Sequence, residues 1–236
     1  MQLFYNPNLN PKESEITFSK LESSHIVRVL RKKEGDLVYI TDGMGGLTTA
    51  RICIADRNKC TGEIVDFKLH EKAWNYHLHI AIAPTKSNDR FEWFLEKATE
   101  IGIDEITPLF CEHSERKVIK SERFEKIIQS ASKQSLKYHF PKLNAPVKFT
   151  DFVSFNRKGQ CFVAHCDPAS DKLLLKNQIS AGGIYTVLIG PEGDFSKREI
   201  AQSLEHKYIP VSLGESRLRT ETAGVVATHS IAFSNL

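Results

Sequence analysis

The sequence predicts a two-part protein, with a β-rich module followed by a parallel α/β module. Short β-branched segments separated by Gly-rich turns dominate the first part, and this pattern is typical of a small barrel. Strand-like runs then alternate with amphipathic helical patterns, which predicts a parallel sheet covered by helices. A polar stretch at residues 68–75 separates the two patterns. We therefore expect one domain at residues 1–72 and a second at residues 73–236.

Composition restricts the class of protein. Of 236 residues, 41% are hydrophobic and 26% are charged, and the net charge is +3, which excludes a disordered tail-like chain. No apolar run approaches the roughly 20 residues that span a bilayer, and the first residues lack the pattern of a secretory signal. Five unevenly spaced cysteines argue against a disulfide framework, so we expect a cytoplasmic protein.

The β-rich module is expected to hold an N-terminal strand, one helix and a group of strands. Residues 23–33 predict a short helix with Ile26, Val29 and Leu30 on one face and basic residues elsewhere. Alternating segments separated by polar or Gly-rich turns then predict strands. These strands are expected at residues 36–41, 47–55 and 61–67.

The α/β module alternates strands with helices. Asn88 opens a helix with an apolar stripe that Gly102 ends, and Ser121 caps a second helix. Ser196 and Glu199 form a capping box at the start of a third helix. A terminal helix of small residues covers residues 222–233. The expected strands cover residues 77–84, 106–110, 160–165, 185–189 and 209–213.

A glycine-containing loop at residues 189–196 is the first candidate site. Ligands in open α/β sheets bind at the carboxyl ends of strands, and Gly190 and Gly193 would let the backbone approach a ligand closely. An ordinary strand-to-helix turn is the alternative. The loop is neither a GxGxxG fingerprint nor a Walker loop, which weakens dinucleotide and nucleoside-triphosphate readings.

A second loop, residues 213–223, carries Arg217, Arg219 and Glu221 into the terminal helix. The N-terminus of a helix attracts anionic groups, and an arginine beside it can hold a planar anionic edge through forked hydrogen bonds. A surface Arg–Glu pair of little energetic value is the alternative.

The segment from Cys161 to Cys166, with His165, invites a metal interpretation. No second ligand pair at zinc-finger spacing accompanies it, so we expect a buried strand ending in a turn at Asp167-Pro168, and no metal site. The loop at residues 166–168 is too generic to assign a function.

Together the two C-terminal loops resemble those of the RsmE-type ribosomal RNA methyltransferases of the SPOUT superfamily. The matching patterns are Ile-Gly-Pro-Glu-Gly-x-Phe-Ser at 189–196 and Leu-Gly-x-x-x-Leu-Arg-x-Glu-Thr-Ala at 213–223. His25-x-x-x-Val-Leu-Arg31 and residues 97–102 and 131–134 extend the resemblance along the chain. Asp194 stands where many members have Gly and should tolerate a left-handed backbone, and Lys137 stands where many have Arg.

The resemblance implies a PUA-like β-barrel followed by a SPOUT domain with a deep trefoil knot, whereas the pattern alone predicts a plain doubly wound sheet. It implies a homodimer that uses S-adenosyl-L-methionine to methylate N3 of a uridine in 16S ribosomal RNA, free or in the small ribosomal subunit. Neither a membrane nor a DNA partner is implied.

Three sets of site residues are expected: a catalytic pair from the chemistry of uridine, cofactor-binding residues from the resemblance, and RNA-binding residues chiefly from local basic patches, for which solvated helix faces are the alternative. Arg219 is expected to stabilise the uridine anion, and Glu221 to orient Arg219 or relay the proton. The expected cofactor-binding residues are Ile189, Gly190, Pro191, Glu192, Gly193, Leu213, Gly214, Leu218, Thr222 and Ala223. The expected RNA-binding residues are Arg28, Arg31, Lys32, Lys86, Arg90, Arg116, Lys133, Gln134 and Lys137.

Three other functions compete with this interpretation. Another SPOUT-class enzyme would methylate a transfer RNA or a ribose, but the N-terminal β module favours the ribosomal type. A non-catalytic RNA-binding assembly factor would have a degenerate pocket, and both loop motifs count against that. A nucleotide-dependent dehydrogenase lacks its glycine fingerprint here.

Overall fold

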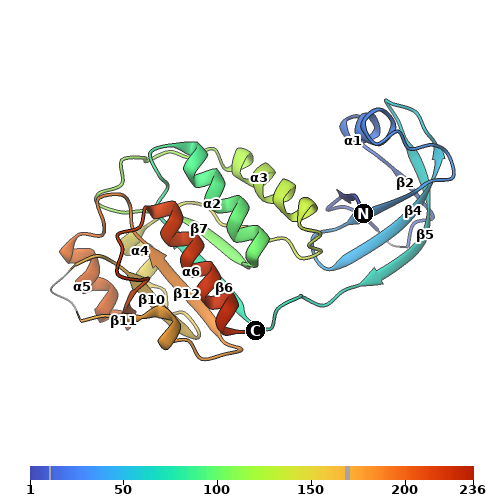
Figure 1. Ribbon diagram of the computed structural model, residues 1–236. Coiled ribbons are helices and arrows are strands. Elements are labelled where there is room, and N and C mark those ends of the chain that lie inside the picture. Colours follow the sequence, from blue (N-terminus) through green and yellow to red (C-terminus); the bar gives the residue numbers. More distant parts are fainter. Residues whose placement is uncertain (11, 168–170) are drawn as a thin grey trace. The chain divides into compact units, whose positions relative to one another are not determined.

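The computed structural model describes residues 1–10, 12–167 and 171–236, and Figure 1 labels its elements. The chain divides into two compact units. The first comprises Met1–Ala73 and Ser132–Phe140, and the second comprises Trp74–Ala131 and Pro141–Leu236. The first unit therefore includes a segment from the middle of the chain, which the sequence pattern did not indicate. Among the described residues, no helix is long and apolar enough to span a membrane.

The first unit is built on a mixed five-stranded sheet in the order β1-β3-β4-β5-β2. β1 runs parallel to β3, and the other neighbours are antiparallel. The three strands expected after the helix are confirmed, with bounds that differ by two residues or fewer. β2 was not expected. The strands are β1 (Leu3–Tyr5), β2 (Glu15–Thr17), β3 (Leu37–Thr41), β4 (Gly46–Ile54) and β5 (Thr61–Leu69).

The basic helix of the first unit is shorter and wider than expected. Helix α1 (Lys20–Ser24) continues into a π-turn, η1 (His25–Val29), in which the Leu30 amide bonds the His25 carbonyl at 3.0 Å. This i→i+5 bond adds a residue to the turn. Ile26 is buried as expected, but the expectation for Val29 was wrong, because the widened turn leaves its side chain 68% exposed.

The second unit contains a sheet whose strands all run parallel, in the order β11-β13-β10-β12-β6-β7-β8, with β9 paired to β7. The five expected strands are confirmed. They are β6 (His77–Ile82), β7 (Glu105–Phe110), β10 (Gln160–Ala164), β12 (Ile184–Ile189) and β13 (Ile209–Ser212). The short strands β8 (Lys142–Leu143), β9 (Val147–Lys148) and β11 (Leu173–Leu174) were not expected.

Helices cover both faces of this sheet. Successive residues at the end of β6 face opposite layers: Ile80 and Ile82 pack with α2, α3 and α6, whereas Ala81 and the residue after the strand, Ala83, pack with α4 and α5. Figure 1 shows α2 and α6 side by side on one face. The capping box at Ser196 is confirmed. The helices are α2 (Asn88–Ile101), α3 (Ser121–Gln134), α4 (Phe149–Ser154), α5 (Lys197–Glu205) and α6 (Thr220–Ser234), with a 3-10 turn at η2 (Leu175–Asn177).

Candidate active site at the carboxyl ends of three strands

The order β13-β10-β12 brings three loops to one edge of the sheet. Each loop follows the carboxyl end of its strand, which is where open parallel sheets bind ligands. The loops enclose a hollow of about 620 Å³, within the range of small-molecule sites. The lining comes from the end of β10, the loop after β13 and the first turns of α6. It comprises Ala164, His165, Cys166, Asp167, Lys172, Asp194, Val211, Ser212, Leu213, Gly214, Glu215, Ser216, Arg217, Leu218 and Ala223.

A second hollow of about 270 Å³ adjoins the first, and six residues line both. It adds the loop after β12 and the start of α6. Its further lining residues are Ile189, Gly190, Pro191, Glu192, Arg219 and Thr220. Eight of the ten expected cofactor-binding residues thus line the two joined hollows, namely Ile189, Gly190, Pro191, Glu192, Leu213, Gly214, Leu218 and Ala223.

Two expected cofactor residues lie elsewhere. Thr222 lines a third hollow, on the side of α6 that faces α2, and Gly193 is exposed in its loop. The Cβ of an alanine at Gly193 would lie 3.1 Å from the His113 Cβ, so glycine there permits a close approach between two loops.

Hydrogen bonds fix the loops to one another. The Thr220 hydroxyl donates to the Gly190 carbonyl at 3.1 Å, which ties the start of α6 to the loop after β12. The Lys86 amide donates to Oε1 of Glu192 at 3.0 Å. The hollows are therefore walled by two loops that are joined through a buried bond.

Asp194 performs a structural task that a glycine could not. Its φ of 61° confirms the expected left-handed backbone. Its Oδ2 accepts a hydrogen bond from the Cys166 amide at 2.7 Å, and its Oδ1 accepts one from the Phe195 amide at 2.8 Å. The side chain therefore joins the loop after β12 to the end of β10.

The end of β10 contributes to the larger hollow, which the sequence pattern does not predict. Ala164, His165, Cys166 and Asp167 line this hollow, although the loop at 166–168 is too generic in sequence to assign a function; Pro168 lies outside the described residues. Burial, together with nearby Lys172, lowers the pKa of His165, so its imidazole is neutral at neutral pH. The rule that ligands bind at the carboxyl ends of parallel strands predicts the other two loops, and it applies equally to this one.

The third hollow, of about 560 Å³, lies where α2 and α6 begin. Arg219 and Arg217 line both this hollow and the second one, so they lie between the two spaces. Glu221 is only 6% exposed, and its Oε1 lies 3.8 Å from Nε of Arg90. Among the residues that the structure describes, Oε2 of Glu221 is buried and has no hydrogen-bond partner. In the same part of the chain, the ion pair of Glu221 is with Arg90 and not with Arg219.

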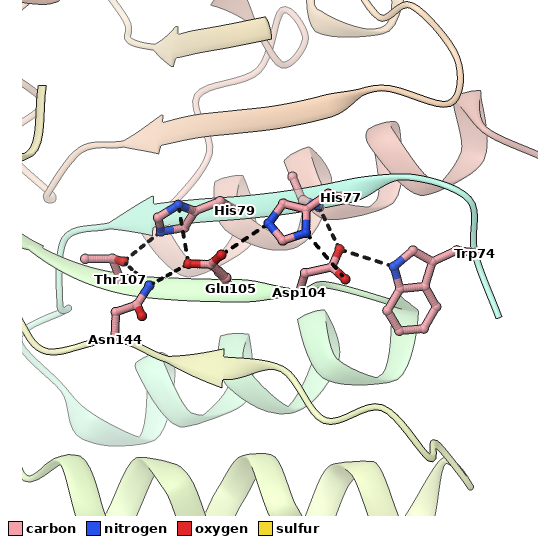
Figure 2. Close-up of polar contacts among 8 residues, drawn as sticks. Trp74, His77, His79, Asp104, Glu105, Thr107 and Asn144 are labelled. Atoms are coloured by element: carbon pink, nitrogen blue, oxygen red, sulfur yellow. Dashed lines mark hydrogen bonds and ion pairs between the residues drawn. The ribbon is translucent and has the colours of Figure 1, made fainter. Parts of the chain in front are cut away.

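A second polar cluster lies at the opposite, amino ends of β6 and β7 (Figure 2). His77 Nε2 lies 3.2 Å from a Glu105 oxygen, and His79 Nε2 lies 2.7 Å from the Thr107 hydroxyl. Asn144 donates to both Glu105 and Thr107. Burial lowers the pKa of His79 to about 4. Because these groups satisfy one another, we interpret the cluster as structural despite its catalytic residue types.

The expected RNA-binding residues fall in both units. Arg28, Arg31 and Lys32 follow α1, and Lys133, Gln134 and Lys137 belong to the first unit through the segment Ser132–Phe140. That segment is held by bonds from the Gly45 amide to the Tyr138 carbonyl and from the Phe140 amide to the Gly43 carbonyl, both 2.9 Å. Lys133 also pairs with Glu22 at 3.5 Å.

In the second unit, Lys86, Arg90 and Arg116 are expected to bind RNA. Arg90 is exposed and lines the third hollow. Arg116 donates from Nε to the Thr85 carbonyl at 3.0 Å, and Lys86 pairs with Glu115 at 2.9 Å. Arg116 therefore also supports the backbone that holds Glu192.

Two family models match the chain. Residues 72–232 match the RNA methyltransferase domain, and residues 22–65 match the RNA methyltransferase PUA domain. The chain is therefore an RNA methyltransferase, with an α/β catalytic domain and a PUA-like N-terminal domain.

Comparison with individual relatives identifies the family within the class of RNA methyltransferases. The ribosomal RNA small subunit methyltransferase E of Buchnera aphidicola subsp. Acyrthosiphon pisum is 32% identical over 91% of this chain and 86% of its own. A probable rRNA-methyltransferase from Porphyromonas gingivalis is 41% identical, with a TM-score of 0.92 over 100% of this chain and 98% of that one. The Neisseria gonorrhoeae ribosomal RNA small subunit methyltransferase E, bound to S-adenosyl methionine, is 26% identical, with a TM-score of 0.79 over 97% and 95%. This chain belongs to the ribosomal RNA small subunit methyltransferase E family.

Proposed function

We propose that this protein methylates N3 of a uridine in 16S ribosomal RNA, with S-adenosyl-L-methionine as the methyl donor. The observation that carries the proposal is the pair of joined hollows at the carboxyl ends of β10, β12 and β13. They fit a nucleoside-sized ligand, because their walls offer backbone groups and apolar side chains such as Val211 and Leu218.

Glu221 and Arg219 are proposed to handle the proton and the charge of the uridine. Uridine N3 holds a proton at neutral pH, so the protein must remove it or stabilise the resulting anion. When bound, S-adenosyl-L-methionine would supply the methyl group, which would leave sulfur as it bonds to N3, and the Glu221 carboxylate would take up the N3 proton. Arg219 lies between the second and third hollows and can donate to a uracil oxygen from there.

The geometry favours a role for Glu221 in taking up the N3 proton rather than in orienting Arg219. The ion-pair partner of Glu221 is Arg90, and within the described ranges no group donates to its buried second oxygen. A buried carboxylate oxygen without a donor is costly, so a ligand N–H would relieve that cost.

The decisive experiment is mass spectrometry of ribosomal RNA from a strain that lacks the protein, with and without the purified protein added back. A missing 3-methyluridine that the protein restores supports the proposal. Methylation of a transfer RNA or of a ribose would identify another SPOUT activity, and calorimetry that detects no S-adenosylmethionine binding would leave only an assembly factor.

The finer architecture is also part of the proposal. The resemblance to the SPOUT superfamily supports a barrel at residues 1–72, a deep trefoil knot within residues 73–236, and a homodimer with the cofactor site beside its interface. Light scattering on the purified protein tests the dimer: a mass near twice the chain supports it, and a mass near that of one chain contradicts it.

RNA contact is proposed for the basic residues of the first unit, and salt dependence tests it. Each Lys/Arg–phosphate contact contributes about 0.7–0.9 to the slope of log affinity against log salt. Lys32→Glu and Lys137→Glu should each lower that slope by about 1 for binding to small ribosomal subunits. Lys158→Glu, an exposed lysine of the second unit outside the expected set, is the control. An unchanged slope in both variants would remove these contacts.

A further inference from the structure

We infer that His113, in the loop after β7, is a positioning residue for the cofactor site and holds the loop after β12 in the shape that walls the two joined hollows. The inference rests on the proposed use of S-adenosylmethionine and adds a residue that none of the sequence motifs indicates. The described lining of the two hollows does not include His113, so it acts on the cofactor through the backbone of another loop.

The imidazole of His113 bonds two successive carbonyl groups. Its Nδ1 lies 3.1 Å from the Gly193 carbonyl oxygen and 3.0 Å from the Asp194 carbonyl oxygen. A carbonyl oxygen can only accept a hydrogen bond, so Nδ1 must carry a ring proton and donate it to both oxygens. One shared donor therefore ties two consecutive residues of the loop after β12 to the loop after β7.

The two carbonyl groups belong to the turn that forms one wall of the smaller hollow. Pro191, Glu192 and Asp194 line that hollow, and Asp194 lines the larger one as well. The turn is closed by a hydrogen bond from the Asp194 amide to the Pro191 carbonyl at 2.9 Å. A displacement of the carbonyl groups at positions 193 and 194 would therefore displace backbone that borders the proposed cofactor site.

Close packing of the two loops brings the imidazole within bonding distance of the turn. A Cβ added at Gly193 would lie 3.1 Å from the His113 Cβ, and the atoms nearest to it all belong to His113. A side chain at position 193 would therefore push the two loops apart. Gly193 is among the expected cofactor-binding residues, and its contact with His113 gives a different reason for a glycine at this position.

The loop after β7 is itself held in place on both sides of His113. The Cys111 amide donates to the Ser114 hydroxyl at 2.9 Å, and the Ser114 amide donates to the Cys111 carbonyl at 3.1 Å. Glu199, in the first turn of α5, accepts a hydrogen bond from the Glu112 amide at 2.9 Å. Because the backbone that carries the ring is already fixed, His113 loses little conformational freedom when it bonds the neighbouring loop.

Three substitutions of His113 test whether the position of the donor matters. His113→Ala removes the donor. In His113→Asn the side-chain amide nitrogen lies near the position of Nδ1 and can donate to the same carbonyl groups, whereas in His113→Gln it lies farther from the backbone, near the position of Nε2. We therefore expect His113→Ala and His113→Gln to release the turn, and His113→Asn to hold it.

Calorimetry with S-adenosylmethionine measures the effect without any RNA. His113→Ala and His113→Gln should raise the Kd about 3- to 10-fold, the range for the net loss of one hydrogen bond. His113→Asn should stay within about twofold of the wild type. His206→Ala, which removes an exposed histidine at the end of α5, is the matched control. Because His113 is also exposed, each variant should melt within about 4 °C of the wild type.

Steady-state methylation of small ribosomal subunits from a deletion strain separates positioning of the cofactor from the chemical step. His113→Ala should raise the KM for S-adenosylmethionine by about the same factor as the Kd. The kcat and the KM for the subunits should stay within about twofold of the wild type, because a residue that only shapes the cofactor site leaves both unchanged.

A double-mutant cycle tests whether His113 acts through the backbone at Gly193. Gly193→Ala should force the two loops apart and weaken S-adenosylmethionine binding by itself. Once the loops are apart, the bonds of His113 are already lost. The Kd of the double variant Gly193→Ala/His113→Ala should therefore lie within about twofold of that of Gly193→Ala alone.

The outcomes separate this inference from the proposed function. If the wild-type protein neither binds S-adenosylmethionine nor forms methyluridine, the proposed function fails, and the inference fails with it. If the wild-type protein does both and His113→Ala keeps its Kd, the positioning role is overturned while the proposed function stands. Equal Kd values for His113→Asn and His113→Ala would overturn the hydrogen-bond mechanism. A lower kcat at an unchanged KM for S-adenosylmethionine, or additive losses in the double-mutant cycle, would also overturn the inference.

Discussion

The two ends of one parallel sheet use polar side chains in opposite ways. At the amino ends of β6 and β7, histidines and carboxylates pair with one another (Figure 2). At the carboxyl ends of β10, β12 and β13, charged groups border open hollows. The same residue types therefore stabilise the protein at one end and are available to ligands at the other. Residue type alone does not separate the two roles, whereas the direction of the strands does.

The two ends differ in whether their buried polar groups have hydrogen-bond partners. His79 is 5% exposed and pairs with Thr107. Glu221 is equally buried at 6%, yet one of its carboxylate oxygens has no hydrogen-bond partner in the part of the chain that the structure describes. Because unpartnered buried polar groups are costly, their presence requires an explanation, and ligand binding is one.

Arg219→Ala should give the largest effect, a loss of methylation rate. It tests most directly whether charged groups at the carboxyl ends of the strands act on a ligand. Removal of one preorganised charge-stabilising donor costs about 10²- to 10³-fold in rate. The single-turnover rate should fall by at least about a hundredfold, while calorimetry shows S-adenosylmethionine affinity little changed. Arg198→Ala, an exposed arginine on α5, is the control. Near-normal methylation by Arg219→Ala would remove this residue from the mechanism.

The next prediction concerns the polar cluster at the amino ends of β6 and β7 and the effect of pH on protein stability. Burial lowers the pKa of His79 from 6.5 to about 4. Burial alone would raise the pKa of Glu105, but the bond from Asn144 and the two histidines bring it below its usual value. The unfolded chain therefore binds more protons than the folded one as the pH falls below 6.5, and both groups make the protein less stable in acid.

His79→Gln should remove much of this acid sensitivity, because glutamine cannot titrate and can still bond Thr107. Between pH 6.5 and 4 the wild-type protein should lose up to about 3 kcal/mol more stability than the variant, at about 1.4 kcal/mol per pKa unit. Urea unfolding across this range measures the difference. His77→Gln, with a side chain 40% exposed beside the same Glu105, is the control. Parallel pH profiles for wild type and His79→Gln would contradict the assignment.

Local patterns predicted much of the fold. Gly102 ends α2 at φ 130°, and the Ser196–Glu199 capping box begins α5, as the sequence indicates. Both signals act within a few residues, so a single sequence carries them. Val29 escaped prediction because the local sequence does not show that the helix widens into a π-turn, which moves Val29 away from the buried face. Short α4 gave no period long enough to recognise.

Long-range pairings were beyond the sequence pattern. The ion pair of Arg90 with Glu221 joins residues far apart in the chain, and Asp194 reaches Cys166 across two strand ends. Such contacts depend on strand order, and the pattern of strands and helices does not specify the order β13-β10-β12. The two loop motifs located the hollows, whereas the contribution of the end of β10 became visible only in the structure.

The third prediction concerns the packing of α6 against α2, beside the third hollow. Gly224 of α6 lies against α2, and an added Cβ would meet Phe94 at 2.6 Å and Ile82 at 2.8 Å. Gly224→Ala should therefore destabilise the protein by about 1–3 kcal/mol, as overpacked cores do. Urea unfolding measures the loss. Gly182→Ala is a partial control, because it adds a methyl group in open space but at a φ of 72°. Equal or greater stability of Gly224→Ala would show that α2 and α6 can separate freely.

The smallest predicted effect lies at Asp194 and separates backbone strain from side-chain bonding. A left-handed conformation costs an ordinary residue about 1–2 kcal/mol relative to glycine, and a hydrogen bond to a charged group such as a carboxylate contributes about 1.5–3 kcal/mol. Asp194→Gly removes both the strain and the two bonds to its partly exposed carboxylate, so it should be about 1–2 kcal/mol less stable than wild type. Asp194→Ala keeps the strain and loses the bonds, so it should be about 1 kcal/mol less stable than Asp194→Gly.

The two variants should nevertheless bind S-adenosylmethionine alike. Both lack the bond from the Cys166 amide to Asp194, which fixes one wall of the larger hollow. A few-fold loss of affinity in each, measured by calorimetry, would show that the aspartate shapes the open end of the sheet. If only Asp194→Ala weakens binding, backbone strain rather than the side chain sets the geometry of the loop. Asp194 would then not contribute to the difference between the amino ends of the strands, where polar groups pair with one another, and the carboxyl ends, where they border the hollows.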